Sequence, residues 1–433
     1  MKLKEKISID EFDGKKFKAY QSQSDDNEKA ILTHYLHGYG NGVSKQLEKG
    51  AKGSIKELVR YKIEEENIQT VNEDDALQQL LFEVTDVPFP TPDKTHFKFI
   101  DLFAGIGGFR LAMQNLGGKC VFTSEWDKEA KKTYRANFGE VPFGDITKEE
   151  TKKYIPDGFN VLCAGFPCQA FSIAGRRGGF EDTRGTLFFD VAEIIKRKKP
   201  EAIFLENVKG LRSHDKGKTL ETILNVLRND LGYYVPEPKI INAKDFGVPQ
   251  NRERIYIVGI HKTKLGEFAF NFPAVLNLPT KLGAILEDSV DDKYTLSDNL
   301  WEGHQRRKVQ HKLKGNGFGY SLFNSESRYT STISARYYKD GSEILVEQNS
   351  KNPRKLTPRE AARLQGFPDS FKIPVSDTQA YKQFGNSVAV PVIREIAQKM
   401  VEVLLNPEAR KPLDLWEQDC LIPRDLEPKV KIG

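Results

Sequence analysis

The stretch FIDLFAGIGGFR, residues 99–110, decides the fold. An apolar run leads into Gly105, Gly107 and Gly108, and residues with helical spacing follow. A strand, a glycine turn and a helix in this order are typical of a parallel α/β sheet, where glycines let the backbone approach a nucleoside ligand at the carboxyl end of the strand. Tight packing between helix and strand would also require glycines here. No Gly-Lys-Ser/Thr follows the turn, which argues against a phosphate-transfer loop of the Walker type.

The sequence around this stretch alternates between short apolar runs and helical segments. Each run has Gly, Pro, Asp or Asn at or next to its end and is typical of a buried strand. Helical spacing is found in GGFRLAMQNLG, in GTLFFDVAEIIKRKKP and after Pro391. This alternation predicts the α/β class, with a parallel sheet flanked by helices. The predicted strands are FKFIDLFAG, KCVFTSEWD, NVLCAGFP, EAIFLENV and RIYIVGI.

The chain is divided into segments of different composition. Residues 1–87 are rich in charge and weakly patterned, with one predicted helix near Ser54. The alternate prolines of VPFPTP follow, which forbids a helix and indicates an extended connector. After Pro273 the strand–helix alternation is lost until a helical pattern returns near the end. We therefore expect an N-terminal extension and linker at 1–95, an α/β domain at 96–275, a loop-rich second domain at 276–375, a segment returning to the α/β domain at 376–410, and a tail at 411–433.

Composition limits the class of protein. The 433 residues are 38% hydrophobic and 29% charged, as in soluble proteins. The N-terminus lacks the apolar core of a signal peptide and no apolar run is long enough to cross a bilayer, so we expect a cytoplasmic protein without membrane contact. The net charge of +5 permits a nucleic-acid partner without requiring one. The 4 cysteines and 7 histidines form no Cys-x-x-Cys or His-x-x-x-His pattern, so neither disulfides nor a metal site are expected.

A cysteine in an unusual setting lies in VLCAGFPCQAFS, residues 161–172. An isolated cysteine is most often a small core residue, and Cys163, inside the apolar run, fits that description. Cys168 instead follows Pro167 at a strand end, where open parallel sheets place their sites. No Ser-His-Asp set or partner histidine lies nearby in the sequence, so thiol-protease chemistry is not indicated. Cys168 is therefore a candidate nucleophile of another kind.

Charged residues accompany three further predicted strands. Glu206 ends the run EAIFLENV and is either a helix cap, a solvent-facing carboxylate or, beside Cys168, a general acid. Arg252 and Arg254 alternate in QNRERIYIVG, so both project to the same side of a strand. They are either surface charges or partners of an anionic ligand or a buried carboxylate. Glu125, at the end of KCVFTSEWD, can hold ribose hydroxyls, as acidic strand ends do in dinucleotide-binding folds.

Five blocks in order, DLFAGIGG, GFPCQAFS, ENV, QNRER and QFGNSVAVPV, resemble the sequence blocks of bacterial DNA (cytosine-5-)-methyltransferases of the Dcm type. The resemblance covers about residues 97–275 and 354–405, and it extends to RGGFEDTRGTLFFDV and KLTPREAARLQGFPDS. It implies a Rossmann-like, S-adenosylmethionine-dependent methyltransferase domain. A small target-recognition domain would be inserted at 276–375, and the N-terminal extension would precede the catalytic domain.

The resemblance also implies roles for individual residues. S-adenosyl-L-methionine would be the cofactor, with Glu125 on its ribose, Trp126 against its adenine and Asp145 on the adenine amino group. The other residues implied at the cofactor are Phe103, Gly105, Ile106, Gly108, Ile146, Pro167, Leu187, Asn386, Ser387 and Val388. The implied catalytic residues are the nucleophile Cys168 together with Glu206, Arg252 and Arg254. Those implied at DNA are Ser172, Arg328, Arg336 and Lys339.

The expected chemistry gives each catalytic group a task. Carbon 5 of cytosine is too weak a nucleophile to accept a methyl group directly, so addition of the Cys168 thiolate to carbon 6 would activate it. Glu206 would offset the charge at the ring nitrogen, and Arg254 would orient that carboxyl group. The target base must leave the duplex to be reached. The glycine-rich loop 170–185 is expected to close over it.

Two other functions are compatible with the same blocks. An RNA cytosine methyltransferase of similar fold is one, because the catalytic blocks alone do not identify the polymer, and a catalytically silent DNA-binding regulator is the other. The size of the 276–375 region favours duplex DNA, and the intact Cys168, Glu206 and Arg254 argue against a silent protein. We expect double-stranded DNA as the partner, a cognate restriction endonuclease as a functional partner, and a monomeric chain.

Target specificity is expected in residues 276–375, because base edges must be read by groups outside the common catalytic blocks. Arg336 suits guanine through a bidentate contact, while phosphate contact alone explains Arg328, Arg336 or Lys339 equally well. The resemblance to Dcm-type recognition regions predicts a palindrome that begins CC and ends GG, either CCWGG or the looser CCNGG. The extension at 1–95 is expected to be an appendage or to pack on the catalytic domain, with DNA binding or dimerisation as the alternative.

Overall fold

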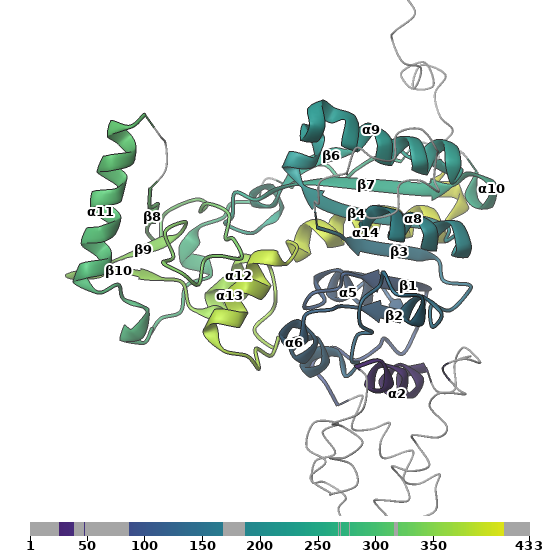
Figure 1. Ribbon diagram of the computed structural model, residues 1–433, viewed down its shortest axis with the longest axis horizontal. Coiled ribbons are helices and arrows are strands. Elements are labelled where there is room, and N and C mark those ends of the chain that lie inside the picture. Colours follow the sequence, from purple (N-terminus) through teal and green to yellow (C-terminus); the bar gives the residue numbers. More distant parts are fainter. Residues whose placement is uncertain are drawn as a thin grey trace, which may run out of the picture.

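A computed structural model describes residues 26–38, 47, 86–167, 187–266, 268, 270–276, 278–315 and 319–410 (Figure 1). Five features of the sequence analysis lie outside these residues: Cys168, Ser172, the loop 170–185, the helix expected near Ser54 and the tail 411–433.

A seven-stranded sheet forms the centre of the larger part of the molecule, in the order β2-β1-β3-β4-β7-β5, with β6 also paired to β7. The five strands predicted from the sequence are all present, as β1, β2, β3, β4 and β7. Their residues are almost entirely buried, as the apolar runs predicted. The bounds are β1 Phe97–Leu102, β2 Gly118–Ser124, β3 Val161–Gly165, β4 Ala202–Val208, β5 Tyr233–Tyr234, β6 Lys239–Asn242 and β7 Glu253–His261.

The prediction of a parallel sheet is wrong for one strand, β7. β1 to β4 are parallel, but β7 runs antiparallel to β4, β5 and β6. The cause is the short connection 243–252 between β6 and β7, which holds only one turn of 3₁₀ helix and no crossover helix. As a result, the beginning of β7 lies at the edge of the sheet where β3 and β4 end.

Helices cover both faces of this sheet. Alternate strand residues divide between two buried clusters: Phe99 belongs to one with α5 and α14, and Ile100 to the other with α8 and α9. Each large apolar side chain removed from water in these clusters contributes roughly 1.5–3 kcal/mol. The helices of this part are α5 Gly108–Gln114, α6 Lys128–Phe138, α7 Glu149–Lys152, α8 Leu187–Lys198, α9 Lys218–Asn225, α10 Lys262–Leu265 and α14 Val390–Leu405.

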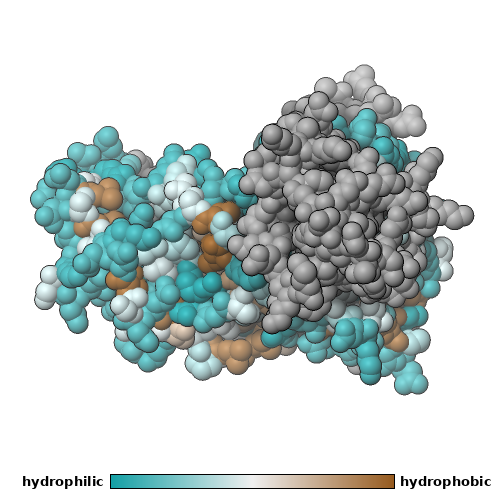
Figure 2. All heavy atoms as spheres, turned by 90° about the horizontal axis from the view of Figure 1, so that it is seen from below, coloured by the Kyte–Doolittle hydropathy of each residue, from teal (hydrophilic) through white to brown (hydrophobic). Residues whose placement is uncertain are grey.

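A smaller lobe lies to one side of the large sheet (Figure 1). It contains the three-stranded sheet β10-β9-β8 and the long helix α11 Asp298–Leu313, with α12 Pro358–Leu364 and α13 Asp377–Asn386 between the lobe and the large sheet. Its strands are β8 Leu322–Phe323, β9 Leu345–Gln348 and β10 Lys351–Lys355. Apart from α11 and two short 3₁₀ helices, Leu282–Ala284 and Asp292–Tyr294, the described residues of 276–321 have little regular secondary structure. The visible surface of the lobe is mainly hydrophilic with small hydrophobic patches (Figure 2).

The N-terminal extension contributes a helix that the sequence analysis did not predict, α2 Asp26–Gly38. Its buried residues include Ile31, Leu32 and Leu36, which do follow helical spacing, but the charged segments around them concealed the pattern. α2 contacts β2 at the edge of the large sheet (Figure 1). Among all helices of the described residues, none is long and apolar enough to cross a membrane.

Candidate active site

Two reasons for glycine were expected in the turn after β1, close approach of a ligand and tight packing, and each applies to a different glycine. Gly105 has φ +55°, and a Cβ built on it would meet no atom within 4 Å. Gly107 has φ +87°, and a Cβ there would lie 2.3 Å from the Phe138 ring. Phe103 also has positive φ, 55°, which shows how sharply the chain bends. Gly107 is therefore required by packing and conformation, whereas Gly105 leaves open space beside the backbone.

Glu125 fastens the end of β2 to this turn. Its Oε2 accepts a hydrogen bond from the Gly105 amide at 2.7 Å, and its Oε1 accepts from the amides of Trp126 and Asp127, each at 2.8 Å. Burial raises the pKa of the Glu125 carboxyl, and these three backbone donors oppose the rise. Trp126, next to it, leaves 80% of its side chain exposed. An acceptor and an aromatic face thus lie together beside the open space at Gly105.

Residues 143–146 extend the same edge. The Phe143 carbonyl accepts from the Glu125 amide at 2.8 Å, and Ser124 and Phe143 form a parallel bridge. Asp145 is exposed and accepts from the Thr147 amide at 3.0 Å, while the Ile146 side chain is buried. The structure therefore brings Asp145 and Ile146 to the strand end that carries Glu125.

The turn between α13 and α14 approaches the glycine turn from the far end of the chain. A Cβ built on Gly108 would lie 2.6 Å from Val388 Cγ2 and 3.3 Å from Ser387 Oγ. Val388 is buried, Ser387 half-buried and Asn386 exposed. Of the remaining residues implied at the cofactor, Ile106 is buried, Pro167 is exposed after β3, and Leu187 is half-buried at the start of α8.

A carboxylate and a guanidinium meet where β3, β4 and β7 come together. Glu206 pairs in register with Gly165 of β3, and Arg254 pairs with Val208 two residues further along β4. Arg254 Nε lies 3.1 Å from Glu206 Oε1, and both side chains are largely buried. Burial raises the pKa of the Glu206 carboxyl, and the positive charges of Arg254 and Arg252 oppose that rise. The ion pair holds a carboxyl group of raised pKa in a fixed orientation.

Asn207 is a residue whose role the sequence analysis missed. Its Nδ2 donates to the Phe166 carbonyl at 2.8 Å, and the side chain is buried. This bond fixes the backbone two residues before Cys168, so it sets the direction in which the chain leaves β3. The only signal in the sequence was its place in the block ENV.

The contacts of the Arg252 side chain could not be predicted from the alternate positions of Arg252 and Arg254 in the sequence. Its side chain is buried and donates to the carbonyls of Ile333 at 3.2 Å, Gly385 at 3.1 Å and Ser387. Burial lowers the pKa of the guanidinium to about 9, and repulsion from Arg254 adds to this. Arg252 thus ties the beginning of β7 to the small lobe and to the turn before α14.

The residues expected at DNA begin at the rim of this site. The amide of Thr330 donates to the Pro249 carbonyl at 2.8 Å, and Gln250 Oε1 accepts from the Ile333 amide at 3.1 Å. A Cβ on Gly385 would lie 2.3 Å from the carbonyl carbon of Ser334, so these backbones are in contact. The chain continues from there to the exposed side chains of Arg336 and Lys339, and Arg328 is exposed two residues before Thr330.

The fold and this arrangement define the class: the chain has the Rossmann-like fold of S-adenosylmethionine-dependent methyltransferases. It is similar to the solved structure of the Entamoeba histolytica methyltransferase EhMeth, with a TM-score of 0.57 and 20% identity over 72% of this chain and 99% of that one. It is also similar to a putative DNA modification methyltransferase encoded within an Escherichia coli prophage, with a TM-score of 0.53 and 22% identity over 72% of this chain and 100% of that one. At these identities the likeness establishes the fold.

Sequence similarity identifies the family. The family described as C-5 cytosine-specific DNA methylase matches residues 97–402. The type II methyltransferase M.HpaII of Haemophilus parainfluenzae is 57% identical over 350 residues, 77% of this chain and 96% of that protein. M1.ScrFI of Lactococcus lactis subsp. cremoris is 62% identical over 319 residues, 73% and 81% of the two chains. The DNA-cytosine methyltransferase of Escherichia coli strain K12 is 42% identical over 405 residues, 78% and 83% of the two chains.

The chain therefore belongs to the C-5 cytosine-specific DNA methylase family and is a DNA (cytosine-5-)-methyltransferase. This confirms the family resemblance seen in the five sequence blocks. It also decides between polymers, because the family and these relatives are DNA methyltransferases, and the RNA alternative is no longer needed.

Proposed function

We propose that this enzyme transfers a methyl group from S-adenosyl-L-methionine to carbon 5 of a cytosine flipped out of double-stranded DNA, at a short palindromic site. The observation that carries the proposal is the Glu206–Arg254 ion pair beside the end of β3, where the chain leads into Cys168. The glycine turn and Glu125 lie on the same edge of the sheet, so cofactor and target base would meet there.

The described residues fit the cofactor. Gly105 leaves open space beside the backbone, Glu125 offers carboxylate oxygens suited to ribose hydroxyls, and the exposed Trp126 offers an aromatic face for adenine. Asp145 is exposed at the same edge and can accept from an adenine amino group. When bound, the cofactor supplies an electrophilic methyl group. We propose that the site is completed by Phe103, Ile106, Gly108, Ile146, Pro167, Leu187, Asn386, Ser387 and Val388.

The catalytic roles follow from the chemistry of cytosine. The Cys168 thiolate forms a bond to carbon 6, which makes carbon 5 nucleophilic, and loss of the carbon-5 proton later breaks the carbon–sulfur bond. Glu206 donates a hydrogen bond or a proton at the ring nitrogen, which its raised pKa favours. Arg254 holds that carboxyl group in place. Arg252 donates hydrogen bonds to three backbone carbonyls and so fixes the shape of the site. Cys168, Glu206 and Arg254 contact the base.

We propose that residues 276–375 read the target sequence, with Arg336 at a guanine and Arg328, Lys339 and Ser172 at the DNA. The contact between Ser334 and Gly385 supports a position for Arg336 at the rim of the active site. The proposed target is CCWGG or CCNGG. The similarity to type II methyltransferases supports a role as the methylase of a restriction–modification system, with a cognate endonuclease as functional partner. We also propose that the enzyme is monomeric.

The proposed division of the chain is unchanged: 1–95, 96–275, 276–375, 376–410 and 411–433. It is supported by the small three-stranded sheet within 276–375 and by the packing of α14 against α5.

A methyl-transfer assay tests the function. Purified protein, tritium-labelled S-adenosylmethionine and either duplex DNA or tRNA are combined, and labelled 5-methylcytosine is measured. We expect labelling of DNA alone. Labelling of tRNA alone, or DNA binding without labelling, would overturn the proposed reaction.

A further inference from the structure

Helix α2 lies outside residues 97–402 that match the family, yet it is built into the catalytic domain. Ile31 and Leu36 are buried in the same cluster as Phe122, Phe143 and Ile146. The contact lies at β2, the edge strand whose end carries Glu125 (Figure 1). The extension therefore meets the catalytic domain at the strand that leads to the proposed cofactor site.

His34 bonds directly to the backbone of that strand. Its Nε2 lies 3.2 Å from the Thr123 amide, and its Nδ1 lies 2.8 Å from the Ala30 carbonyl. Because a carbonyl can only accept, Nδ1 carries the proton and Nε2 is the acceptor for Thr123. The ring also packs against Phe143, with 4.7 Å between centroids. Both hydrogen-bonding positions of the imidazole are thus used.

This bond completes the outer edge of β2. The Thr123 carbonyl, on the same edge, accepts from the Phe143 amide at 2.9 Å, and the Thr123 residue is fully buried. Without His34 the Thr123 amide would be buried without an acceptor, and such a group costs much more than an ordinary hydrogen bond contributes. Glu125 is two residues further along, and it holds Gly105.

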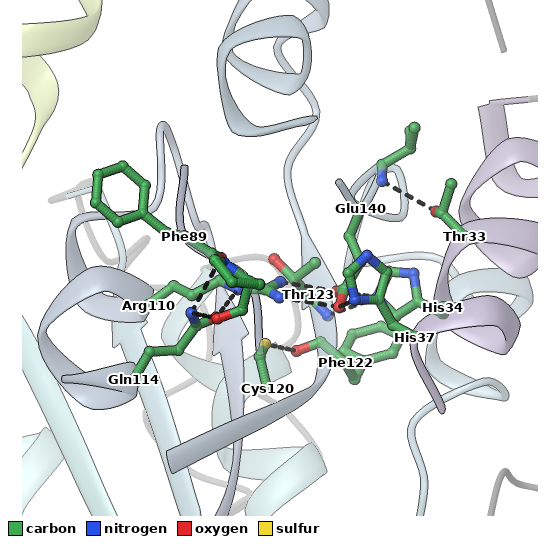
Figure 3. A network of polar contacts seen from close by, with 12 residues as sticks. Thr33, His34, His37, Phe89, Arg110, Gln114, Cys120, Phe122, Thr123 and Glu140 are labelled. Carbon is green, nitrogen blue, oxygen red and sulfur yellow. Dashed lines mark hydrogen bonds and ion pairs between the residues drawn. The ribbon is translucent and has the colours of Figure 1, made fainter. Parts of the chain in front are cut away.

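A second connection runs through Glu140 (Figure 3). The carboxylate of Glu140 accepts two hydrogen bonds from Arg110, at 2.8 and 2.9 Å. Two imidazole rings lie beside the same carboxylate without a hydrogen bond to it: Nδ1 of His37 is 3.4 Å away and the unprotonated Nε2 of His34 is 3.7 Å away. The Val141 amide also donates to Thr33 of α2. Since Arg110 belongs to α5, the helix that follows the glycine turn, both connections end at the same turn.

We propose that α2 acts on the cofactor site through His34, a positioning residue that holds the end of β2 so that Glu125 and the glycine turn are preformed for S-adenosylmethionine. The inference rests on the proposed function, because it takes Glu125 to be a cofactor ligand. Removal of the Thr123 bond frees the strand end, and binding of the cofactor must then restore its order.

Substitution of His34 by glutamine or by asparagine tests the two ring nitrogens, Nε2 and Nδ1, separately. Glutamine at position 34 places its oxygen near the former Nε2 and can accept from Thr123, whereas asparagine reaches only as far as Nδ1. In the full-length protein we expect His34→Asn to weaken S-adenosylhomocysteine binding about fivefold in calorimetry. The KM for S-adenosylmethionine should rise similarly, with kcat and the KM for DNA within about twofold of wild type. His34→Gln should bind nearly as wild type does.

Leu36→Ala is the matched control, because it removes packing from the same helix without touching Thr123. It should lower the melting temperature yet keep the cofactor affinity. Equal weakening by Leu36→Ala and His34→Asn would overturn the proposal, since α2 would then act only through stability. Wild-type affinity in His34→Asn would also overturn it.

Hydrogen exchange tests the same coupling without a substitution. Coupling between two sites is reciprocal, so S-adenosylhomocysteine should slow exchange of the α2 amides and of Thr123 about fivefold. Unchanged exchange in the presence of bound ligand would overturn the inference. A wild-type protein that does not bind S-adenosylhomocysteine at all would instead overturn the proposed cofactor site, so the two failures are distinguishable.

Discussion

Arg254 Nε lies 3.1 Å from Glu206 Oε1, and the two side chains meet because β7 runs antiparallel to β4. In a wholly parallel sheet the first residues of β7 would lie at the opposite edge from the last residues of β4. The reversal of one strand therefore brings an arginine from a strand beginning to a carboxylate at a strand end.

The first prediction concerns this pair. Glu206→Gln should lower kcat about 100-fold, because a glutamine cannot donate a proton to the ring nitrogen. Arg254→Ala removes an interaction that lowers the pKa of Glu206, so that pKa should rise further. The rate that depends on protonated Glu206 should then persist to higher pH. Single-turnover methylation measured across pH checks both effects.

Glu253→Gln is the control for the Glu206 variant. Glu253 precedes Arg254 on the same strand, but its carboxylate is paired with the exposed Lys209. Its rate should stay within about twofold of wild type, as expected for an exposed ion pair. A Glu206→Gln enzyme as fast as this control would remove the proposed acid from the mechanism.

The second prediction concerns the nucleophile. Cys168→Ala should abolish methyl transfer and leave DNA binding nearly unchanged, because phosphate and base contacts come from other residues. Wild-type protein should form a covalent adduct with DNA that contains 5-fluorocytosine, since fluorine cannot leave as a proton does. Denaturing gel electrophoresis detects the adduct. Cys163→Ala, a substitution in the buried core of β3, should still form it. An active Cys168→Ala enzyme would contradict covalent catalysis.

The third prediction concerns the cofactor. Gly105→Val should place a branched side chain in the open space beside the turn, and Glu125→Ala should remove the ribose acceptor. Each should weaken S-adenosylhomocysteine binding at least about tenfold in calorimetry, with DNA affinity nearly unchanged. Gly158→Val is a control for backbone strain, because Gly158 also has positive φ, +75°, with no atom near a built Cβ. If the control lost as much affinity as Gly105→Val, strain rather than the cofactor would explain the result.

The fourth prediction concerns pH. Burial lowers the pKa of His37 to about 4 and also lowers the pKa of His34, with Glu140 opposing and Arg110 supporting the shift at each histidine. Between about pH 4 and 6.5 these two histidines therefore bind more protons in the unfolded chain than in the folded one. Their contribution to stability should rise with pH across this window and level off above it. The His37 contribution is at most on the order of 3 kcal/mol. Thermal unfolding between pH 4.5 and 7.5 measures it.

His37→Gln is the comparison for that experiment, because glutamine does not titrate. The difference in melting temperature between wild type and variant should change with pH below about 6.5 and stay constant above it. A difference that does not vary with pH would show that protonation of His37 is not linked to unfolding.

Much of the fold could be predicted because apolar runs record burial directly. The strands β1, β2, β3, β4 and β7 were predicted, and so were the helices α5, α8 and α14. The direction of β7 could not be, because it depends on the length and path of the connection rather than on the strand itself. α2 was missed for another reason: its apolar face is defined by what packs on it, namely β2, and a short helix in a charged segment gives a weak pattern.

The site shows the same limit. Glu125, Glu206 and Arg254 could be identified because each stands at the end of a recognisable strand. The bonds of Asn207 to Phe166 and of Arg252 to Ile333 could not, because they join segments that are distant in sequence through backbone carbonyls. Every residue has a backbone carbonyl, so the type of residue does not show which carbonyl accepts a hydrogen bond from a distant side chain.

The last prediction is the target sequence. Arg336→Ala should reduce methylation or relax its specificity at one position while S-adenosylhomocysteine binding stays unchanged, because a guanine contact contributes discrimination of about 1–3 kcal/mol, roughly 5- to 150-fold. Lys351→Ala, an exposed lysine of the same lobe paired with Asp292, is the matched control and should leave the pattern intact. Bisulfite sequencing of plasmid from cells that express each protein gives the readout. Wild-type methylation confined to CCWGG or CCNGG is expected. Methylation of CCGG would correct the central position, and methylation of GCGC or GGCC would reject the proposed target while leaving Cys168 and Glu206 in their roles.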